Sequence, residues 1–251
     1  MGEGRPAEAG RAGGRFRTLL LDIASHVLCR LGKGRRARPP AGTAKVNLGS
    51  GLAVAPGWTN VDASLHAFVA GWPRPLLRLA WRLSGSRGSI PEEAYVAVLR
   101  GHAFVHHDVR HGIPFPDASV DWLYSSHLLE HLHAEEGRRL LEESFRILKE
   151  GGGIRVCVPD LEHAVALYTR GEREAALRFF FAEPEAGSLR RHHSMYDYEM
   201  LRTLLEAAGF TGVTRCAFRQ GRAPDLDVLD NRPEETLYVE ALKPEGRAGK
   251  R

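Results

Sequence analysis

A glycine-rich loop and a nearby carboxylate are the first residues of the chain whose types and spacing could bind a ligand. The loop consists of Asn47, Leu48, Gly49, Ser50 and Gly51. Its two glycines permit a tight turn, and because they lack Cβ atoms, backbone N–H groups can approach a ligand closely. Asp62 follows Gly51 by eleven positions, and a carboxylate placed there can accept hydrogen bonds from both hydroxyls of a ribose. The pair predicts a site for a ribose-containing ligand.

The interval between the loop and Asp62 restricts the class of ligand. In dinucleotide-binding proteins the acidic residue follows the glycines by about 20 positions, after a complete helix. Here Pro56-Gly57 interrupts a much shorter interval, and Val54 stands where a dinucleotide fingerprint has its third glycine. We therefore expect a ligand that has a ribose but no diphosphate.

Further polar residues follow two later apolar stretches of the chain. Asp108 could bind the amino group of an adenine, and the apolar Val109 after it could cover the ring. A turn or helix-cap aspartate is the alternative for Asp108. Ser125 and Ser126 lead into His127, whose imidazole could accept a proton as a general base.

Histidines are frequent after Ser126. His127, Glu130 and His131 match the H-x-x-E-H pattern of inverted zinc peptidases, and histidines four positions apart share one face of a helix. That pattern requires a long helix and a third ligand, whereas here it begins at the end of a predicted strand, so we expect no metal. We expect His127 to be the catalytic base, with His131 or His193 behind it. A hydrogen-bonded structural histidine is the alternative for each.

Seven short apolar stretches predict the strands that position these residues. They span 44–48, 58–62, 103–107, 119–125, 154–158, 213–218 and 236–242. Five of them alternate with helical or irregular segments, including predicted helices over 138–149 and, further on, 198–208. Such alternation indicates a parallel sheet covered on both faces. Ligands of such sheets bind at the carboxyl ends of the strands, where the polar residues lie.

Composition narrows the class of protein further. The chain has 251 residues and a net charge of +4, and its basic excess lies near the two ends. Without a recognisable nucleic-acid-binding motif, this charge does not predict a nucleic-acid partner. Three scattered cysteines without C-x-x-C spacing favour a reducing compartment. No run approaches the roughly 18 apolar residues that span a membrane, and we expect a cytoplasmic protein.

The chain divides into a central domain and two extensions. The composition of residues 1–43 predicts a disordered basic N-terminus that contains one amphipathic helix, at 16–31. The composition of residues 244–251 predicts a disordered tail. The domain spans 44–243 and contains an insertion, 64–101, that could be a lid or a packed helical segment. Two amphipathic stretches, 16–31 and 68–83, could also lie on a membrane surface. We expect both to pack on the domain rather than to contact a membrane.

Taken in order, five segments of the chain resemble the serial motifs of class I S-adenosylmethionine (SAM)-dependent methyltransferases, and most closely the small bacterial-type members. The segments are Val46–Gly51, Gly57–Asp62, Asp108–Asp121, Ser125–Leu132 and Arg146–Asp160. The resemblance covers about 44–243. It implies SAM as the cofactor and a Rossmann-like α/β fold, in which a seven-stranded, mostly parallel sheet has helices on both faces and a reversed last strand.

The resemblance also implies roles for individual residues. By position, the loop from Asn47 to Gly51 would face the methionine portion of SAM, and Asp62 its ribose. Asp108 and Val109 would contact adenine, and the residues from Ser125 to His127 would line the wall near the reactive sulfonium. The sequence departs from the usual pattern twice, with Asn47 in place of an acid and Ala53 in place of a third glycine.

The sequence says least about the acceptor of the methyl group. A segment of clustered Arg and His, 190–193, suits an anionic or hydroxyl-rich acceptor. We therefore predict methyl transfer to a small-molecule or glycan-like acceptor, at oxygen. One alternative is a SAM-binding partner or regulatory protein without catalysis. Another is a zinc hydrolase built on His127 and His131.

Overall fold

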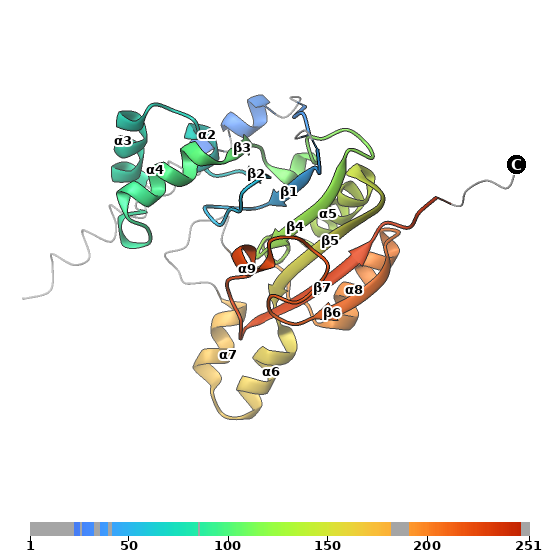
Figure 1. Ribbon diagram of the computed structural model, residues 1–251. Coiled ribbons are helices and arrows are strands. Elements are labelled where there is room, and N and C mark those ends of the chain that lie inside the picture. The colour runs from blue at the N-terminus through green and yellow to red at the C-terminus, as the bar shows by residue number, and fades with distance from the viewer. Residues whose placement is uncertain are drawn as a thin grey trace, which may run out of the picture.

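One sheet of seven strands organises the chain, as a computed structural model shows for residues 23–25, 27–32, 36–39, 42–84, 86–181 and 191–246. The strands are β1 (Lys45–Leu48), β2 (Trp58–Asp62), β3 (Ala103–His106), β4 (Val120–Ser126), β5 (Leu148–Pro159), β6 (Thr211–Cys216) and β7 (Thr236–Leu242). Their order across the sheet is β3-β2-β1-β4-β5-β7-β6 (Figure 1). Each predicted strand is present, and the boundaries of β2 and β7 coincide with the prediction.

The strand directions confirm the predicted reversed last strand. β3, β2, β1, β4 and β5 pair in parallel, and β7 runs antiparallel to both of its neighbours. The chain leaves β1 toward β2 on one side and later returns to β4 on the other. The strand order therefore reverses at β1, and ligands of such sheets bind at this point, at the carboxyl ends of the strands.

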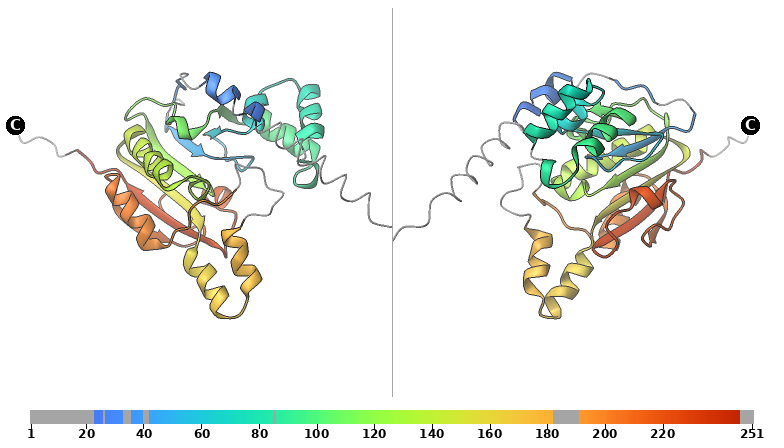
Figure 2. Two further views of the ribbon diagram at one scale, coloured as in Figure 1. Left: turned by 180° about the vertical axis from the view of Figure 1, so that it is seen from behind. Right: turned by 60° about the vertical axis from the view of Figure 1, so that its left-hand side comes forward.

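Helices lie on both faces of the sheet and beyond its β3 edge. They are α2 (Leu65–Val69), α3 (Arg74–Ser84), α4 (Glu92–Gly101), α5 (Ala134–Ile147), α6 (Leu161–Thr169), α7 (Arg173–Phe180), α8 (Tyr198–Ala207) and α9 (Leu226–Leu229). Within the described ranges there are also three short 3-10 helices, η1 (Ser86–Gly88), η2 (Val109–His111) and η3 (Leu129–His131). In Figure 2, α6 and α7 form a hairpin that projects from the end of the sheet.

Alternating side chains of the strands build a separate core on each face, because successive residues of a strand point to opposite sides. Val156 and Val158 of β5 pack in the larger core, which α5 and α8 cover. Cys157 between them packs with Trp58 and Tyr124 in a second core, which α9 covers. A third cluster joins α3 and α4 to the β3 edge, so the insertion 64–101 forms a helical layer of its own.

Two elements begin at least four residues before their predicted starts, and one helix was not predicted. β5 begins six residues early at Leu148, because this residue pairs with Val120 before a bulge that precedes Gly153. α5 begins at Ala134 rather than at 138, and the backbone N–H of His133 donates to the Glu136 carboxylate at 3.0 Å across its first turn. The loop expected between the last two strands contains the one-turn helix α9.

The two predicted amphipathic stretches differ in how much of them can be described. Residues 16–22 and 26 lie outside the described part of the chain, but 23–25 and 27–32 are helical. In α3, Leu77 is buried, while Leu76, Leu79 and Leu83 are exposed. Among the described residues, no helix combines the length and the apolar character needed to cross a bilayer.

Candidate active site

The loop after β1 adopts a conformation that only glycine accommodates readily. Gly49 and Gly51 have φ angles of +66° and +51°, in the left-handed region that costs other residues energy. The N–H of Gly49 donates to the carbonyl of Val61 at 2.8 Å. A Cβ atom on Gly49 would lie 2.9 Å from Cβ of Leu128. The loop is therefore held directly against the chain segment that follows β4.

Asp62 joins this loop to the end of β2. One carboxylate oxygen accepts the N–H of Gly51 at 2.7 Å, and the other accepts the N–H of Ser64 at 2.7 Å. An ionised carboxylate has about four acceptor positions. Each oxygen of Asp62 therefore retains capacity for one further donor, which matches the two hydroxyls of a ribose.

The side chain of Asn47 supports the loop from within. It is almost fully buried, and its amide N–H donates to the carbonyl of Ala53 at 2.9 Å and lies 3.3 Å from the amide oxygen of Asn60. An ionised carboxylate has no proton to donate, so the amide performs a task that the more usual acid could not. Contact between Asn47 and the methionine portion of a cofactor stays a prediction.

Asp108 at the end of β3 is buried and bound to Arg110. The Arg110 Nε lies 3.0 Å from one oxygen and its Nη2 lies 2.6 Å from the other, while the Arg110 backbone N–H also donates to the carboxylate. Burial acts to raise the pKa of Asp108, but the hydrogen bonds from Arg110 outweigh it and lower the pKa below its ordinary value. Asp108 thus caps η2, which was the alternative left open by the sequence. Its contact with adenine stays a prediction.

The N-terminal helical turns cover the ends of β2 and β3. The Ser25 hydroxyl donates to the carbonyl of Ala63 and lies 3.1 Å from Nε2 of His106, and Sγ of Cys29 lies 3.4 Å from the same nitrogen. Burial, together with the negative charges of Asp108 and Asp62, raises the pKa of Cys29 to about 11. The sequence predicted that this helix packs on the domain, and its described turns lie beside the two candidate cofactor carboxylates.

The wall formed after β4 contains the candidate base. His127 has a φ of +50°, a strained conformation that often accompanies a functional constraint. Its Nδ1 lies 3.0 Å from Oε1 of Glu130, and its Nε2 lies 3.1 Å from the hydroxyl of Thr236 on β7. An ionised carboxylate can only accept, so Nδ1 carries the proton and Nε2 presents its lone pair. Ser125 is buried beside it and Ser126 is half-buried.

The other two candidate histidines occupy different surroundings. His131 lies one residue after Glu130 in η3, with Nδ1 3.1 Å from the carbonyl of Arg191, and burial lowers its pKa. His193 donates its backbone N–H to the carbonyl of Glu130 at 2.7 Å, while its ring lies 4.0 Å from that of His133. Because η3 has only three residues, His127 and His131 do not share the long helix that the H-x-x-E-H pattern requires.

The sequence did not predict functional roles for three residues of this region. Glu130 entered it only as part of a zinc motif, although it orients His127. Thr236 was placed at the start of a strand, 109 positions from the histidine that it contacts. His192 was noted only as part of a basic cluster. Only the H-x-x-E spacing could have revealed one of these contacts.

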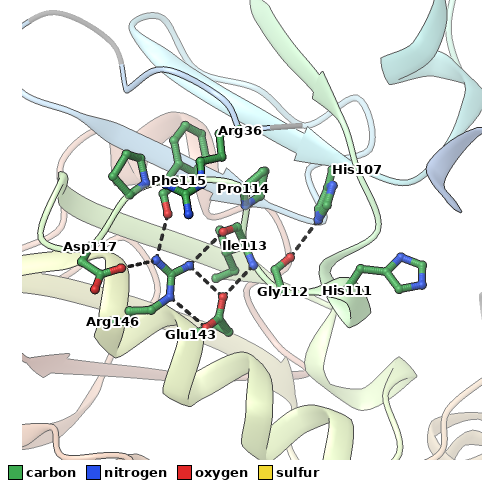
Figure 3. A pocket seen from close by; sticks show the side chains of 11 residues that line it. Arg36, His107, His111, Gly112, Ile113, Pro114, Phe115, Asp117, Glu143 and Arg146 are labelled. Atoms are coloured by element: carbon green, nitrogen blue, oxygen red, sulfur yellow. Dashed lines mark hydrogen bonds and ion pairs between the residues drawn. The ribbon is translucent and has the colours of Figure 1, made fainter. Parts of the chain in front are cut away.

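A cavity of about 780 Å³ lies beside η2 (Figure 3). It is lined by Arg36, His107, His111, the residues 112–117, Glu143 and Arg146. The guanidinium of Arg146 binds the carbonyls of Phe115 and Ile113 and the carboxylates of Asp117 and Glu143. The charge of Arg146 therefore stabilises the loop before β4. Neither Asp62 nor His127 lines the cavity.

Comparison with known proteins agrees with this architecture. Residues 83–156 match the family model described as "Methyltransferase domain". A protein of Mycolicibacterium smegmatis described as an S-adenosylmethionine-dependent methyltransferase is 37% identical over 73 residues, which are 28% of this chain and 27% of that protein. The matched part is thus about a quarter of the length of that relative.

Two solved structures are also similar. A chain in the complex between the Haloferax volcanii Trm112 methyltransferase activator and a methyltransferase is 17% identical, with 96% of each chain covered and a TM-score of 0.45. A SAM-dependent methyltransferase of Thermotoga maritima is also 17% identical, with 92% of this chain and 91% of the other covered and a TM-score of 0.45.

The sheet order with its antiparallel β7 and the family match place the chain in the class I methyltransferase fold. Over 73 residues the chain is also similar to the mycobacterial SAM-dependent methyltransferase. The family match begins at residue 83, so the cofactor roles of the loop after β1 and of Asp62 depend on their geometry.

The position of Cys29 gives a prediction about the cofactor site. We expect iodoacetamide to alkylate Cys29 slowly, because the thiol is buried and its raised pKa leaves little thiolate. We expect SAM to slow this reaction further, because a ligand bound beneath the helical turns stabilises the closed form. Mass spectrometry of alkylated peptides measures the rate, and the half-buried Cys216 is the control. An equal rate with and without SAM would show that these turns do not cover the cofactor.

Proposed function

We propose that this protein transfers the methyl group of SAM to a hydroxyl oxygen of a small-molecule or glycan-like acceptor, with His127 as the general base. The arrangement of Glu130, His127 and Thr236 at the end of β4 carries the proposal. Leu128, the neighbour of His127, packs against Gly49. His127 therefore lies next to the loop that would hold the methionine portion of SAM.

The glycine loop after β1 and Asp62 fit two different parts of the cofactor. The glycine loop offers main-chain N–H groups without Cβ obstruction, and Asp62 retains acceptor capacity for ribose hydroxyls. When bound, SAM supplies an electrophilic methyl group on a sulfonium. Alignment of the acceptor with that methyl group can contribute about 7–11 kcal/mol to catalysis.

The proton of the acceptor determines what His127 has to do. With SAM bound, the acceptor oxygen would take the methyl group while the electron pair of the carbon–sulfur bond stays on sulfur, and Nε2 of His127 would accept the hydroxyl proton. The carboxylate of Glu130 then stabilises the resulting imidazolium through Nδ1. The hydroxyl of Thr236 lies within hydrogen-bond distance of Nε2. Rotation of the Thr236 side chain would let the hydroxyl of the acceptor bind Nε2 instead.

The acceptor class rests on the residues beside this base. Arg191 is exposed, and its carbonyl contacts His131. The basic segment 191–193 is therefore fixed next to Glu130, where clustered Arg and His can bind hydroxyl-rich or anionic groups. Arg190, which belongs to the same cluster in the sequence, lies outside the described residues. Tritiated methyl transfer from SAM into cell extract, with glycan, lipid and protein fractions counted separately, tests this class.

Asp62 provides the test of cofactor binding. We expect Asp62→Ala to weaken SAM binding at least tenfold, or about 1.4 kcal/mol, because the change removes both the ribose acceptor and the link to Gly51. Isothermal titration calorimetry measures the affinity. Asp62→Asn, which keeps one acceptor oxygen, should lose less.

Asp117→Ala is the matched control, because this exposed carboxylate binds Arg146 away from the strand ends. It should bind SAM as the wild type does. Unchanged affinity in Asp62→Ala would exclude the ribose assignment. If the wild-type protein bound SAM but methylated no fraction of the extract, the alternative of a non-catalytic SAM-binding protein would replace this proposal.

A further inference from the structure

Three side chains around η3 converge on a point that the methyl-transfer scheme does not use. Glu130 and His131 belong to η3, and His192 lies about sixty positions further along the chain. One ligand atom from each residue lies within 4.8 Å of the other two. We propose that Glu130, His131 and His192 form a binding site for a divalent transition-metal ion, of which Zn²⁺ is the best fit.

Glu130 supplies the first argument for a cation. Its side chain is completely buried, and its Oε1 accepts a hydrogen bond from His127. Its Oε2 has no hydrogen-bond partner among the described residues. A buried carboxylate oxygen without a partner is destabilising, and such groups are rare in native proteins. A metal ion at Oε2 would satisfy this oxygen and leave the contact with His127 intact.

The two histidines are already oriented as metal ligands are. Nδ1 of His131 lies 3.1 Å from the carbonyl of Arg191, and Nδ1 of His192 lies 2.6 Å from the carbonyl of Phe179. A carbonyl can only accept, so Nδ1 carries the proton in both rings and Nε2 keeps its lone pair. Metal-binding histidines are commonly fixed in this way by a backbone carbonyl at the second nitrogen.

The donor set selects the kind of metal. Two imidazole nitrogens and one carboxylate oxygen are a set that Zn²⁺ binds in sites with an open fourth position, whereas Ca²⁺ and Mg²⁺ prefer oxygen ligands alone. Zinc bonds of about 2.0–2.1 Å place tetrahedral ligand atoms about 3.3 Å apart. Rotation of the two imidazoles must therefore bring the three ligand atoms somewhat closer together.

This site differs from the H-x-x-E-H pattern in its ligands. Both nitrogens of His127 already have partners, Glu130 and Thr236. His192 replaces His127 as the second imidazole, so the metal site and the proposed base share only the carboxylate of Glu130. The metal site can therefore be tested by direct binding, independently of methyl transfer.

Zinc titration of the full-length, tag-free protein tests the proposal. After removal of metals with a chelator, we expect one Zn²⁺ per chain, measured by competition with a chromophoric indicator and by elemental analysis. His192→Ala should weaken Zn²⁺ binding at least a hundredfold. His193→Ala is the matched control, because the ring of His193 packs against that of His133 rather than joining the site, and this variant should bind Zn²⁺ as the wild type does.

Two further measurements separate a metal site from a folding effect. Glu130→Gln should also lose Zn²⁺, and circular dichroism with SAM titration shows whether each variant is folded. His127→Ala should retain Zn²⁺. The proposal is overturned if the wild-type protein binds no stoichiometric Zn²⁺, if folded His192→Ala binds it with wild-type affinity, or if His127→Ala abolishes binding while His192→Ala preserves it.

Discussion

Replacement of His127 by Ala is expected to lower kcat for methyl transfer to a hydroxyl acceptor by about 10²- to 10⁴-fold, the usual contribution of a general base. Affinity for SAM should be unchanged, because His127 donates its backbone N–H to Cys157 and directs its side chain toward Glu130 and Thr236, not toward Asp62. Single-turnover transfer of a tritiated methyl group, combined with calorimetry, measures the two effects separately.

His127→Asn is the matched variant, because asparagine adopts the backbone conformation of His127 at lower cost than alanine does. His127 has a positive φ, which Asn tolerates better than Ala does. His127→Asn should therefore lose as much activity as His127→Ala while unfolding at the wild-type temperature. Thr236→Val removes only the hydroxyl at Nε2, so it should retain most of the activity. Full kcat in folded His127→Asn would mean that the acceptor needs no base from this residue.

The fold was predictable because each strand carries its own apolar signal. Thr236–Leu242 is rich in apolar residues, and Trp58–Asp62 contains Trp58 and Val61 directly after the turn-forming Pro56-Gly57. The start of β5 carries no such signal, since Lys149 to Gly152 contain no apolar side chain. This segment joins the sheet because Leu148 pairs with Val120, and that pairing depends on where β4 lies.

The candidate site was predictable only where its contacts are local in the chain. The glycine loop and Asp62 could be paired from their spacing, because β1 and β2 are consecutive and adjacent. The contact of Thr236 with His127 depends on β7 entering the sheet next to β5. Likewise, the packing of Cys29 against His106 joins residues 77 positions apart. Periodicity and motif spacing contain no information on such distances.

A buried ionic cluster holds the segments behind this site together. Arg155 of β5 is completely buried and binds Asp230 at 2.6 Å and Glu240 of β7 at 2.9 Å. Burial disfavours its charge, but the hydrogen bonds that it donates to Asp230 and the nearby negative charges outweigh burial and raise the pKa of Arg155. Asp230 also accepts the hydroxyl of Tyr124 in β4. The cluster thus joins β4, β5 and β7, whose ends carry His127 and Thr236.

Arg155→Ala is expected to lower the free energy of unfolding by about 3–5 kcal/mol, because removal of one partner leaves the buried carboxylates of Asp230 and Glu240 uncompensated. Urea denaturation followed by circular dichroism measures the change. Arg202→Ala is the matched control, since this arginine pairs with Glu199 and Glu206 on the exposed face of α8 and should shift the midpoint little. Arg155→Met combined with Asp230→Leu and Glu240→Leu removes all three charges and should recover part of the loss. If Arg155→Ala unfolds at the wild-type urea concentration, the cluster does not stabilise the sheet.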